Sequence, residues 1–427
     1  MKVRETEPKN LNNTKFEKRK VDYGSKEPCQ KISCYNKNMK CILMNKNTEV
    51  LVAEYDAALD GFLTVYEVKH LDYAPLILGK ESQEKDPERF KTVLSGWFRD
   101  RGIPRWRDKL DLLLARLGVG RPEELLDKSF GLSLSDQYWL KPFDSDLAYN
   151  DINFFDHDFD SADFLEASFS NSSQHKASAA SLRTPNNTTD GMLRKAWIIE
   201  GQKRILLKGG FREDTLQPFN EVLASEICRR LGFRHIDYAL GEVHGKIVSK
   251  CECYTTKDTE IIPAYQILAG SAHEDAYETY LKILEEHGIT NAREELENMF
   301  MLDYLILNED RHLNNFGIIR NVNTLEWIET MPIFDNGQSL GVTMLDDGAV
   351  AVEGVGRFFY DIKSFDEIIK TVREPGRFDF SRLDDLPDFF RELLIKYQGK
   401  SRLSDNRIAA LVRILRDRIM KAKKLAS

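Results

Sequence analysis

The sequence predicts an α+β fold in which a β-rich lobe is followed by a helical lobe. Between residues 188 and 255, short apolar runs alternate with polar residues and are separated by Gly turns, a pattern typical of strands. From residue 256 to residue 427 we expect helices, most clearly over 293–307 and 408–425, where apolar residues recur at helical spacing. Strands that precede helices in this way favour a bilobal layout.

The length of the chain indicates more than one domain. With 427 residues, two or three packed units are expected. Residues 1–36 are rich in Lys, Glu and Asn without periodicity, and we interpret them as a flexible N-terminal arm. Residues 37–142 are expected to form a small mixed α/β unit, with a hairpin over 39–52 and helices that begin near Leu110 and Pro122.

Residues 143–187 differ in composition from both neighbouring regions. Asp residues recur up to Asp163, and a Ser-rich stretch follows over 168–181. The spacing of these carboxylates lacks the central Gly and terminal Glu of an EF-hand, so a calcium site is not predicted. Blocks of like charge are usually solvated, and we interpret this region as an acidic, Ser-rich linker that marks a domain boundary.

Composition narrows the classes of protein. The formal net charge is −8, whereas a nucleic-acid-binding domain more often has a basic surplus, so no direct nucleic-acid partner is expected. No apolar run approaches the roughly 20 residues of a membrane helix, and residues 1–20 lack an apolar signal core. We therefore expect no membrane partner and a cytoplasmic location. The six cysteines form no CxxC pair, which favours buried reduced thiols over a zinc site.

The densest functional signal is NEDRHLNNFG, residues 308–317, which lies between an apolar helix and a strand. Phosphoryl transfer uses a carboxylate to accept the proton of the attacking hydroxyl and an oxygen ligand for a magnesium ion. Kinase catalytic loops place an Asp and an Asn five residues apart for these purposes, as Asp310 and Asn315 are here. His312 has two possible roles, contact with the substrate or stabilisation of the loop, and the sequence does not decide between them.

A second carboxylate, Asp335, follows the apolar run that precedes it and is followed by Gly337. The strand is expected to fix the carboxylate, and the Gly to let the backbone turn away. Magnesium takes only one or two protein carboxylates, so Asn315 and Asp335 form a sufficient pair of ligands.

A lysine is expected to neutralise the nucleotide phosphates. Lys208 ends an apolar strand, from which its ammonium can reach a cleft. A Glu on the following helix usually holds such a lysine, and both Glu221 and Glu226 lie on that helix.

The segment 188–195 precedes the first strand of the β-rich lobe. Thr188, Thr189, Gly191 and Lys195 offer hydroxyls, a flexible turn and a cation, which suit a loop that covers phosphates. The segment matches neither GxGxxG nor the Walker pattern GxxxxGK[ST]. The prediction of a nucleotide site therefore depends on the order Lys, Glu, Asp, Asn, Asp along the chain.

These motifs resemble those of the HipA-like Ser/Thr kinases, a family related in fold to phosphatidylinositol 3/4-kinases. The resemblance is specific at 308–317 and at Phe334-Asp335, and it extends over about 185–425. Asn220-Glu221 resembles the family's Asn-Glu dipeptide, which favours Glu221 over Glu226 as the partner of Lys208.

The resemblance implies a bilobal protein-kinase-like fold, the cofactors ATP and Mg²⁺, and a protein substrate. It implies that Asp310 is the catalytic base, with His312 and Lys208 in the catalytic group, and that Asn315 and Asp335 bind magnesium. A small regulatory partner protein is a further expectation.

The resemblance also implies where adenine and a regulatory phosphate would lie. Backbone groups near Lys250, Glu252 and Cys253 would hold adenine at a hinge. In the family, the loop before the first lobe strand can be autophosphorylated on Ser, which ejects the loop. The matching residues here are Thr188 and Thr189, and the family's Gly-Gln-Pro-Lys run is replaced by Gly-Met-Leu-Arg-Lys.

Three functions remain open from the sequence. The first is a protein Ser/Thr kinase. The second is a small-molecule or lipid kinase of similar fold, although the chain lacks a basic amphipathic helix for a lipid surface. The third is a pseudokinase or regulatory module that binds nucleotide without turnover, which the complete set of acidic, amide and lysine groups disfavours.

Overall fold

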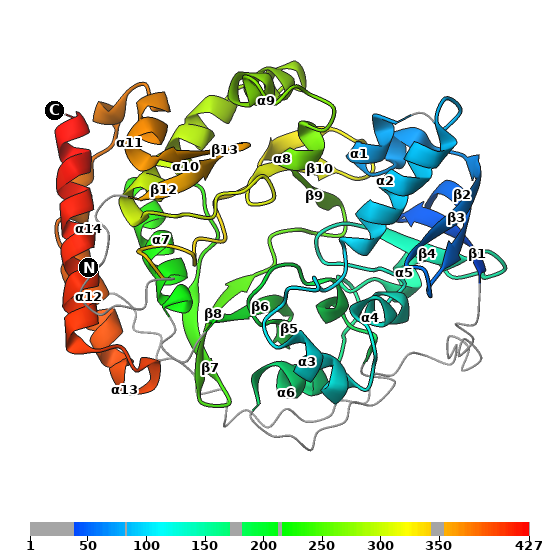
Figure 1. Cartoon of the computed structure of the whole chain (residues 1–427), viewed down its shortest axis with the longest axis horizontal. Coiled ribbons are helices and arrows are strands. Elements are labelled where there is room, and N and C mark those ends of the chain that lie inside the picture. Colours follow the sequence, from blue (N-terminus) through cyan, green and yellow to red (C-terminus); the bar gives the residue numbers. More distant parts are fainter. Residues whose placement is uncertain (1–37, 82, 171–181, 212–215, 343–353, 427) are drawn as a thin grey trace.

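The computed structural model describes residues 38–81, 83–170, 182–211, 216–342 and 354–426. Within these ranges the chain has a mixed α/β fold built on several small antiparallel sheets (Figure 1). The N-terminal arm expected over 1–36 and the Ser-rich residues 171–181 lie outside the described residues. None of the helices within the described ranges combines the length and the apolarity that crossing a membrane requires.

The first sheet has the strand order β3-β2-β1-β4, and every pair of neighbours is antiparallel. The predicted hairpin is confirmed, since β1 and β2 are joined by a tight turn in which Lys46 has a left-handed φ of 51°. The strands are β1 (Met39–Asn45), β2 (Thr48–Asp56), β3 (Gly61–Val68) and β4 (Tyr138–Pro142).

Short helices accompany this sheet; those before residue 100 pack on it, whereas the helix that ends at Gly118 packs with a second sheet. The two predicted helices are confirmed: one ends at Gly118, with a φ of 71°, and the other begins with Pro122 in its first turn. The helices are η2 (Leu71–Tyr73), α1 (Leu76–Gly79), α2 (Pro87–Arg99), α3 (Leu110–Leu117) and α4 (Pro122–Lys128).

A second antiparallel sheet has the order β5-β6-β8-β7, with β5 (Lys195–Glu200), β6 (Lys203–Gly209), β7 (Ala239–Val243) and β8 (Lys246–Glu252). Helix α7 (Gln217–Leu231) follows β6 and ends at Gly232. Because side chains alternate along a strand, Lys208 lies on the opposite face from Leu207. The face that bears Leu207 packs against α3 and against a helix of the region 143–187.

The interpretation of 143–187 as a solvated linker is wrong for the part that the structure describes. This part contains α5 (Tyr149–Ile152), α6 (Ala162–Phe169) and η4 (Pro185–Thr188). Phe164 and Phe169 are 2% and 1% exposed and belong to the same apolar cluster as strands β5 and β6. The prediction was based on the Asp residues and did not weigh the aromatic residues between them. Burial of these aromatic side chains offsets the entropic cost of ordering this segment.

We predict that Phe164→Ala lowers the free energy of unfolding by about 3–5 kcal/mol, because it leaves a cavity in a buried cluster. Phe143→Ala is the matched control, since Phe143 is 39% exposed and stacks on Lys40; its loss should cost about 1 kcal/mol or less. Denaturant unfolding of both variants would measure the difference. Equal losses would mean that α6 adds nothing to the core.

The remainder of the chain is largely helical, as predicted for 256–427. Its centre is α10 (Ala292–Ile306), in which Leu296 to Ile306 are buried throughout. The other helices are α8 (Ala264–Ile267), α9 (Ala276–Glu286), α11 (Phe365–Ile368), η5 (Ile369–Thr371), η6 (Pro375–Arg377), η7 (Phe380–Leu383), α12 (Leu386–Lys396), α13 (Gln398–Ser401) and α14 (Asp405–Ala426).

Two small sheets lie beside these helices. The strand predicted after residue 317 is confirmed as β10 (Gly317–Asn321), which lies between β9 (Thr259–Pro263) and β11 (Trp327–Thr330). A separate hairpin is formed by β12 (Val355–Phe358) and β13 (Asp361–Ser364). The strand expected before Asp335 is only an isolated bridge between His235 and Ile333. The cysteines in the described ranges, Cys41, Cys228, Cys251 and Cys253, are free thiols, as expected.

Candidate active site

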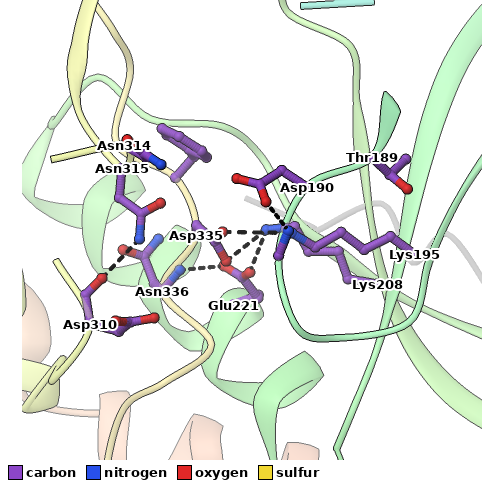
Figure 2. A network of polar contacts seen from close by, with 12 residues as sticks. Thr189, Asp190, Lys195, Lys208, Glu221, Asp310, Asn314, Asn315, Asp335 and Asn336 are labelled. Carbon is purple, nitrogen blue, oxygen red and sulfur yellow. Dashed lines mark hydrogen bonds and ion pairs between the residues drawn. The ribbon is translucent and has the colours of Figure 1, made fainter. Parts of the chain in front are cut away.

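Three of the predicted residues meet in one buried cluster of charges (Figure 2). Lys208, at the end of β6, lies with its Nζ 2.9 Å from Oε1 of Glu221 and 3.0 Å from Oδ1 of Asp335. Tyr238 Oη completes the shell of Nζ at 3.2 Å. The side chains of Lys208 and Glu221 are 4% and 2% exposed, so their charges are held within the protein and not on its surface.

Glu221 is the helix partner of the lysine, and Glu226 is not. The second oxygen of Glu221 accepts a hydrogen bond from the backbone N–H of Asn336 at 2.8 Å. Glu226 instead pairs with Arg229 and Arg230 on the outer side of α7. Glu221 therefore links α7, β6 and the segment after Asp335 in a single contact.

The electrostatics of the cluster favour the ionised pair. Burial alone would raise the pKa of Asp335, but the ammonium groups of Lys208 and Lys195 lower it well below its usual value. Burial likewise opposes the charge on Lys208, yet Asp335 and Glu221 raise the pKa of this lysine well above normal. Asp335 therefore stays an anion, which is the state a cation ligand needs.

The backbone at Asp335 differs from expectation. The left-handed conformation falls on Asp335 itself, with a φ of 55°, and not on Gly337. Gly337 matters through close packing, because a Cβ there would lie 3.3 Å from Cβ of Gln217 in α7.

The loop after α10 is anchored by Arg311, which is 1% exposed. Its Nε and Nη2 donate to the two carboxylate oxygens of Asp303 at 2.9 and 2.8 Å. Nη1 donates to the carbonyl of Phe334 at 2.7 Å, and Nη2 also donates to Oδ1 of Asn336 at 2.5 Å. One guanidinium thus joins the loop that carries Asp310 to the segment that carries Asp335.

Asn315 is oriented by the same loop. Its Nδ2 donates to the backbone carbonyl of Asp310 at 2.8 Å, which leaves the amide oxygen as the free end. Figure 2 shows this oxygen on the side of Asp335. Asn315 and Asp335 therefore offer the two oxygen donors that the sequence predicted. Among the described residues no three His, Cys, Asp or Glu side chains converge on one point, so a cage built wholly by the protein is not formed there.

The carboxylate of Asp310 is 42% exposed and has two basic neighbours. Nε of Arg357, in β12, lies 3.4 Å from Oδ1, and Nε2 of His312 lies 3.9 Å from Oδ2. Burial raises the pKa of Asp310, while His312 and Arg357 lower it. Nδ1 of His312 accepts a hydrogen bond from the backbone N–H of Asn314 at 3.2 Å, which fits a histidine that braces the loop.

Lys195 and Gly191 approach the cluster from the predicted phosphate-covering segment. Lys195 pairs with Lys208 across the β5–β6 ladder, and its Nζ lies 3.9 Å from Oδ2 of Asp335. Gly191 has a φ of 92°, and a Cβ there would lie 2.7 Å from that Nζ, so only Gly fits this turn. Asp190 points toward the same ammonium groups (Figure 2).

The two threonines of this segment face inward. Thr189 is 4% exposed, and its hydroxyl donates to the carbonyl of Asn186 at 2.9 Å. The hydroxyl of Thr188 lies 3.0 Å from the carbonyl of Pro185 and 3.2 Å from that of Leu132. Neither hydroxyl points at Asp310 or Lys208 in this structure.

The side chains at the predicted hinge are occupied elsewhere. Lys250 pairs with Glu200, and Glu252 pairs with Lys203, on the face of the sheet opposite to Lys208. The backbone N–H of Cys253 donates to the carbonyl of Arg204 at 2.8 Å. The structure therefore does not bring the side chains of Lys250 and Glu252 to the cluster.

The sequence interpretation missed the residues that hold the cluster together. Arg311, Asp303, Tyr238, Asn336 and Arg357 were given no role. One signal could have found Asp303: it is an acid inside the apolar run of α10, where a buried charge requires a partner.

No protein-family model matches the chain. In sequence it is 28% identical over 131 residues to the serine/threonine-protein kinase CtkA of Helicobacter pylori (strain J99). The chain resembles a serine/threonine kinase in sequence. This match confirms the predicted resemblance at that level; it spans 29% of this chain and 40% of the relative.

Solved structures were also compared. The crystal structure of the Helicobacter pylori proinflammatory kinase CtkA aligns with a TM-score of 0.41 and 18% identity, over 54% of this chain and 94% of that one. The HipA chain of Shewanella oneidensis, solved with HipB and operator DNA, aligns with a TM-score of 0.49 and 13% identity, over 90% and 97% of the two chains.

Proposed function

We propose that the protein is an ATP- and Mg²⁺-dependent, HipA-like Ser/Thr protein kinase that transfers the γ-phosphate to a protein hydroxyl. The observation that supports this most strongly is the buried contact of Lys208 with both Glu221 and Asp335, next to the loop of Asp310 and Asn315. In this proposal the sheet β5–β8 with α7 is one lobe, and the helices that follow β8 are the other.

The donor atoms fit magnesium. Asp335 is kept ionised by its lysine neighbours, and the amide nitrogen of Asn315 is engaged, so that the amide oxygen is left to bind a cation. Magnesium favours such oxygen ligands and needs few of them from the protein. A bound Mg²⁺ would neutralise phosphate charge, and Lys208 and Lys195 would add their own positive charges to the same region.

The side chains next to Lys208 on the same face of the sheet would suit a nucleobase. Ser249 lies opposite Lys208 in the ladder and is 0% exposed. Its hydroxyl and that of Tyr254 have no hydrogen-bond partner among the described residues. Leu206, Cys251 and Phe334 pack around Tyr254. Apolar surface with a few unmatched polar atoms suits a flat ring with polar edges. Backbone groups from Lys250 to Cys253, other than the N–H of Cys253 that is bonded to Arg204, would then contact adenine, as the resemblance implies.

In this proposal, Asp310, Lys208 and His312 have separate roles in phosphate transfer. Asp310 is half exposed beside the cluster, where it can orient the attacking hydroxyl and accept its proton. Lys208, held by Glu221, would orient the phosphates. His312 is placed to brace the loop and to lower the pKa of Asp310, in which case it acts through the base and not on the substrate.

The decisive test is transfer of label from γ-labelled ATP to a lysate, with wild type and Asp335→Ala compared. We expect a labelled protein band that is lost in the variant. Label in a lipid or small-molecule fraction would support the second kinase function instead. Binding of nucleotide without any transfer would support a pseudokinase. A protein substrate, a small regulatory partner protein and a cytoplasmic location stay predictions.

Autophosphorylation at Thr188 or Thr189 also belongs to this proposal. Both hydroxyls are bonded to backbone carbonyls, so the segment would have to leave its position before either could be modified. Intact-mass measurement after incubation with ATP would compare wild type with Asp310→Ala. Equal masses would contradict autophosphorylation without affecting the assignment of a kinase.

We predict that Arg357→Gln moves the acidic limb of the kcat/KM profile to higher pH. Arg357 lowers the pKa of Asp310, so its removal raises that pKa, and the base is then deprotonated only at higher pH. The effect should shrink as salt is added, because the pair is half exposed. Lys363→Gln, in the same hairpin but paired with Asp361, is the control. An unchanged profile would argue against electrostatic coupling of Arg357 to the base.

A further inference from the structure

A second group of basic side chains lies away from the active site, in a pocket between α3, α6 and the start of β5. Helices α3 and α6 lie side by side there (Figure 1). The pocket has a volume of about 130 Å³. Its charged lining residues are Arg107, Asp108, Lys109, Arg116, Arg194 and Lys246.

Among the described residues, Arg116 is buried without a carboxylate partner. The side chain is 6% exposed, and its Nη1 donates to the carbonyls of Ala167 and Ser170 at 2.9 and 3.0 Å. Its Nε has no hydrogen-bond partner in the part of the chain that the structure describes. A buried guanidinium normally has an anion beside it, because dipoles alone do not offset the loss of hydration.

Arg107 is also buried and forms no ion pair with a carboxylate among the described residues. It is 4% exposed, its Nε donates to the carbonyl of Gly191 at 2.7 Å, and its Nη2 donates to the carbonyl of Thr189. Burial lowers the pKa of Arg107 to about 10, and the opposing effect of Asp190 does not cancel this. Its positive charge is therefore also uncompensated by any ion pair among the described residues.

The other charged residues that line the pocket do not neutralise the two arginines. Asp108 is the acidic member, and its Oδ2 already lies 3.1 Å from Nε of Arg194. Lys109 has an exposed side chain at the same opening. The pocket thus combines two buried guanidinium groups with a net positive lining.

We propose that this pocket binds a phosphate group, either as a free phosphate or small phosphomonoester, or as a phosphoserine of this chain. Guanidinium groups match the oxygens of phosphate in both charge and geometry, which favours this anion over a halide. The phosphoserine source is considered because Ser168 and Ser170 line the pocket.

The pocket is joined to the predicted phosphate-covering segment. Arg107 holds the carbonyls of Thr189 and Gly191, and the backbone N–H of Asp108 donates to the carbonyl of Met192 at 2.9 Å. A phosphate bound to Arg107 would therefore lie one side chain away from the turn at Gly191. Only this consequence rests on the proposed kinase function; binding itself does not.

The test is calorimetric titration of inorganic phosphate into the full chain after phosphatase treatment, at constant ionic strength. We expect saturable binding that Arg116→Gln weakens about tenfold or more, the usual loss for one charge-assisted hydrogen bond. Lys109→Gln, with an exposed side chain, should weaken it less and without altering the fold. Lys370→Gln is the charge-matched control and should bind as wild type does.

Further variants and measurements distinguish binding in this pocket from binding in the active site, and phosphoserine from a free phosphate. Lys208→Met should retain phosphate binding; its loss there would mean that phosphate entered the active site, and would overturn the proposal. If Arg116→Gln does not fold, an unchanged affinity in Lys109→Gln and Arg194→Gln would overturn it equally. Peptide mass spectrometry before phosphatase treatment identifies the source: a phosphate located on Ser168 or Ser170 indicates phosphoserine, and unmodified peptides over these residues indicate a free ligand. Absence of binding by the dephosphorylated wild type would contradict both.

Discussion

Asp310→Asn is expected to reduce kcat for phosphate transfer by about 10²–10⁴-fold, the usual contribution of a positioned general base. The amide keeps the shape of the side chain but cannot accept the proton of the hydroxyl. The fold should be unaffected, because the carboxylate is 42% exposed and its contacts with Arg357 and His312 are long. Initial rates of ATP consumption and label transfer would measure the loss.

The matched control for this prediction is Glu309→Gln. Glu309 precedes Asp310 in the same loop, and its backbone N–H donates to the carbonyl of Gln338 at 3.1 Å. The contacts described above for Lys208, Asn315 and Asp335 do not include its carboxylate. Its charge interacts with that of Asp310 only through space, so its loss should leave kcat within about threefold of wild type. Transfer by Asp310→Asn at the wild-type rate would remove Asp310 from the role of base, and the assignment of the loop would fail with it.

The cluster of Lys208, Glu221 and Asp335 could be predicted because each part has a local signature. Lys208 lies near the end of a strand, Glu221 lies in the first half of the next helix, and Asp335 precedes an Asn-Gly pair, so each could be recognised within a few residues. Their convergence was then inferred from their order along the chain. The structure brings these three together within hydrogen-bond distance.

The scaffold was harder to predict, because its contacts join distant segments. Phe164 belongs to the same buried cluster as Leu207, although the Asp content of its region suggested solvent exposure. Tyr238, in the segment between α7 and β7, contacts Lys208. No spacing in the sequence indicates that contact. The adenine contact of backbone groups near Lys250, Glu252 and Cys253 stays a prediction. Strand register, which the sequence left open, places the side chain of Lys250 on the face opposite to Lys208.

Loss of Arg311 should destabilise the protein about as much as loss of a core aromatic residue. We expect Arg311→Leu to lower the free energy of unfolding by about 3–5 kcal/mol, because it leaves the carboxylate of Asp303 buried without its cation. The carbonyl of Phe334 and Oδ1 of Asn336 lose a donor as well. Arg89→Gln, which breaks a surface pair with Glu81, should cost less than about 1 kcal/mol and is the control for loss of an Arg–carboxylate contact.

A double-mutant cycle separates the ion pair from the other contacts of Arg311. If the buried charge of Asp303 causes most of the loss, then Asp303→Leu combined with Arg311→Leu should be more stable than the sum of the single changes predicts. If the bonds to Phe334 and Asn336 dominate, the two changes should be nearly additive. Either result bears on function, because those bonds fix Asp335 relative to the loop of Asp310. A strongly coupled pair would mean that Asp303 acts chiefly by keeping Arg311 charged and in place, and so positions both halves of the site through one side chain.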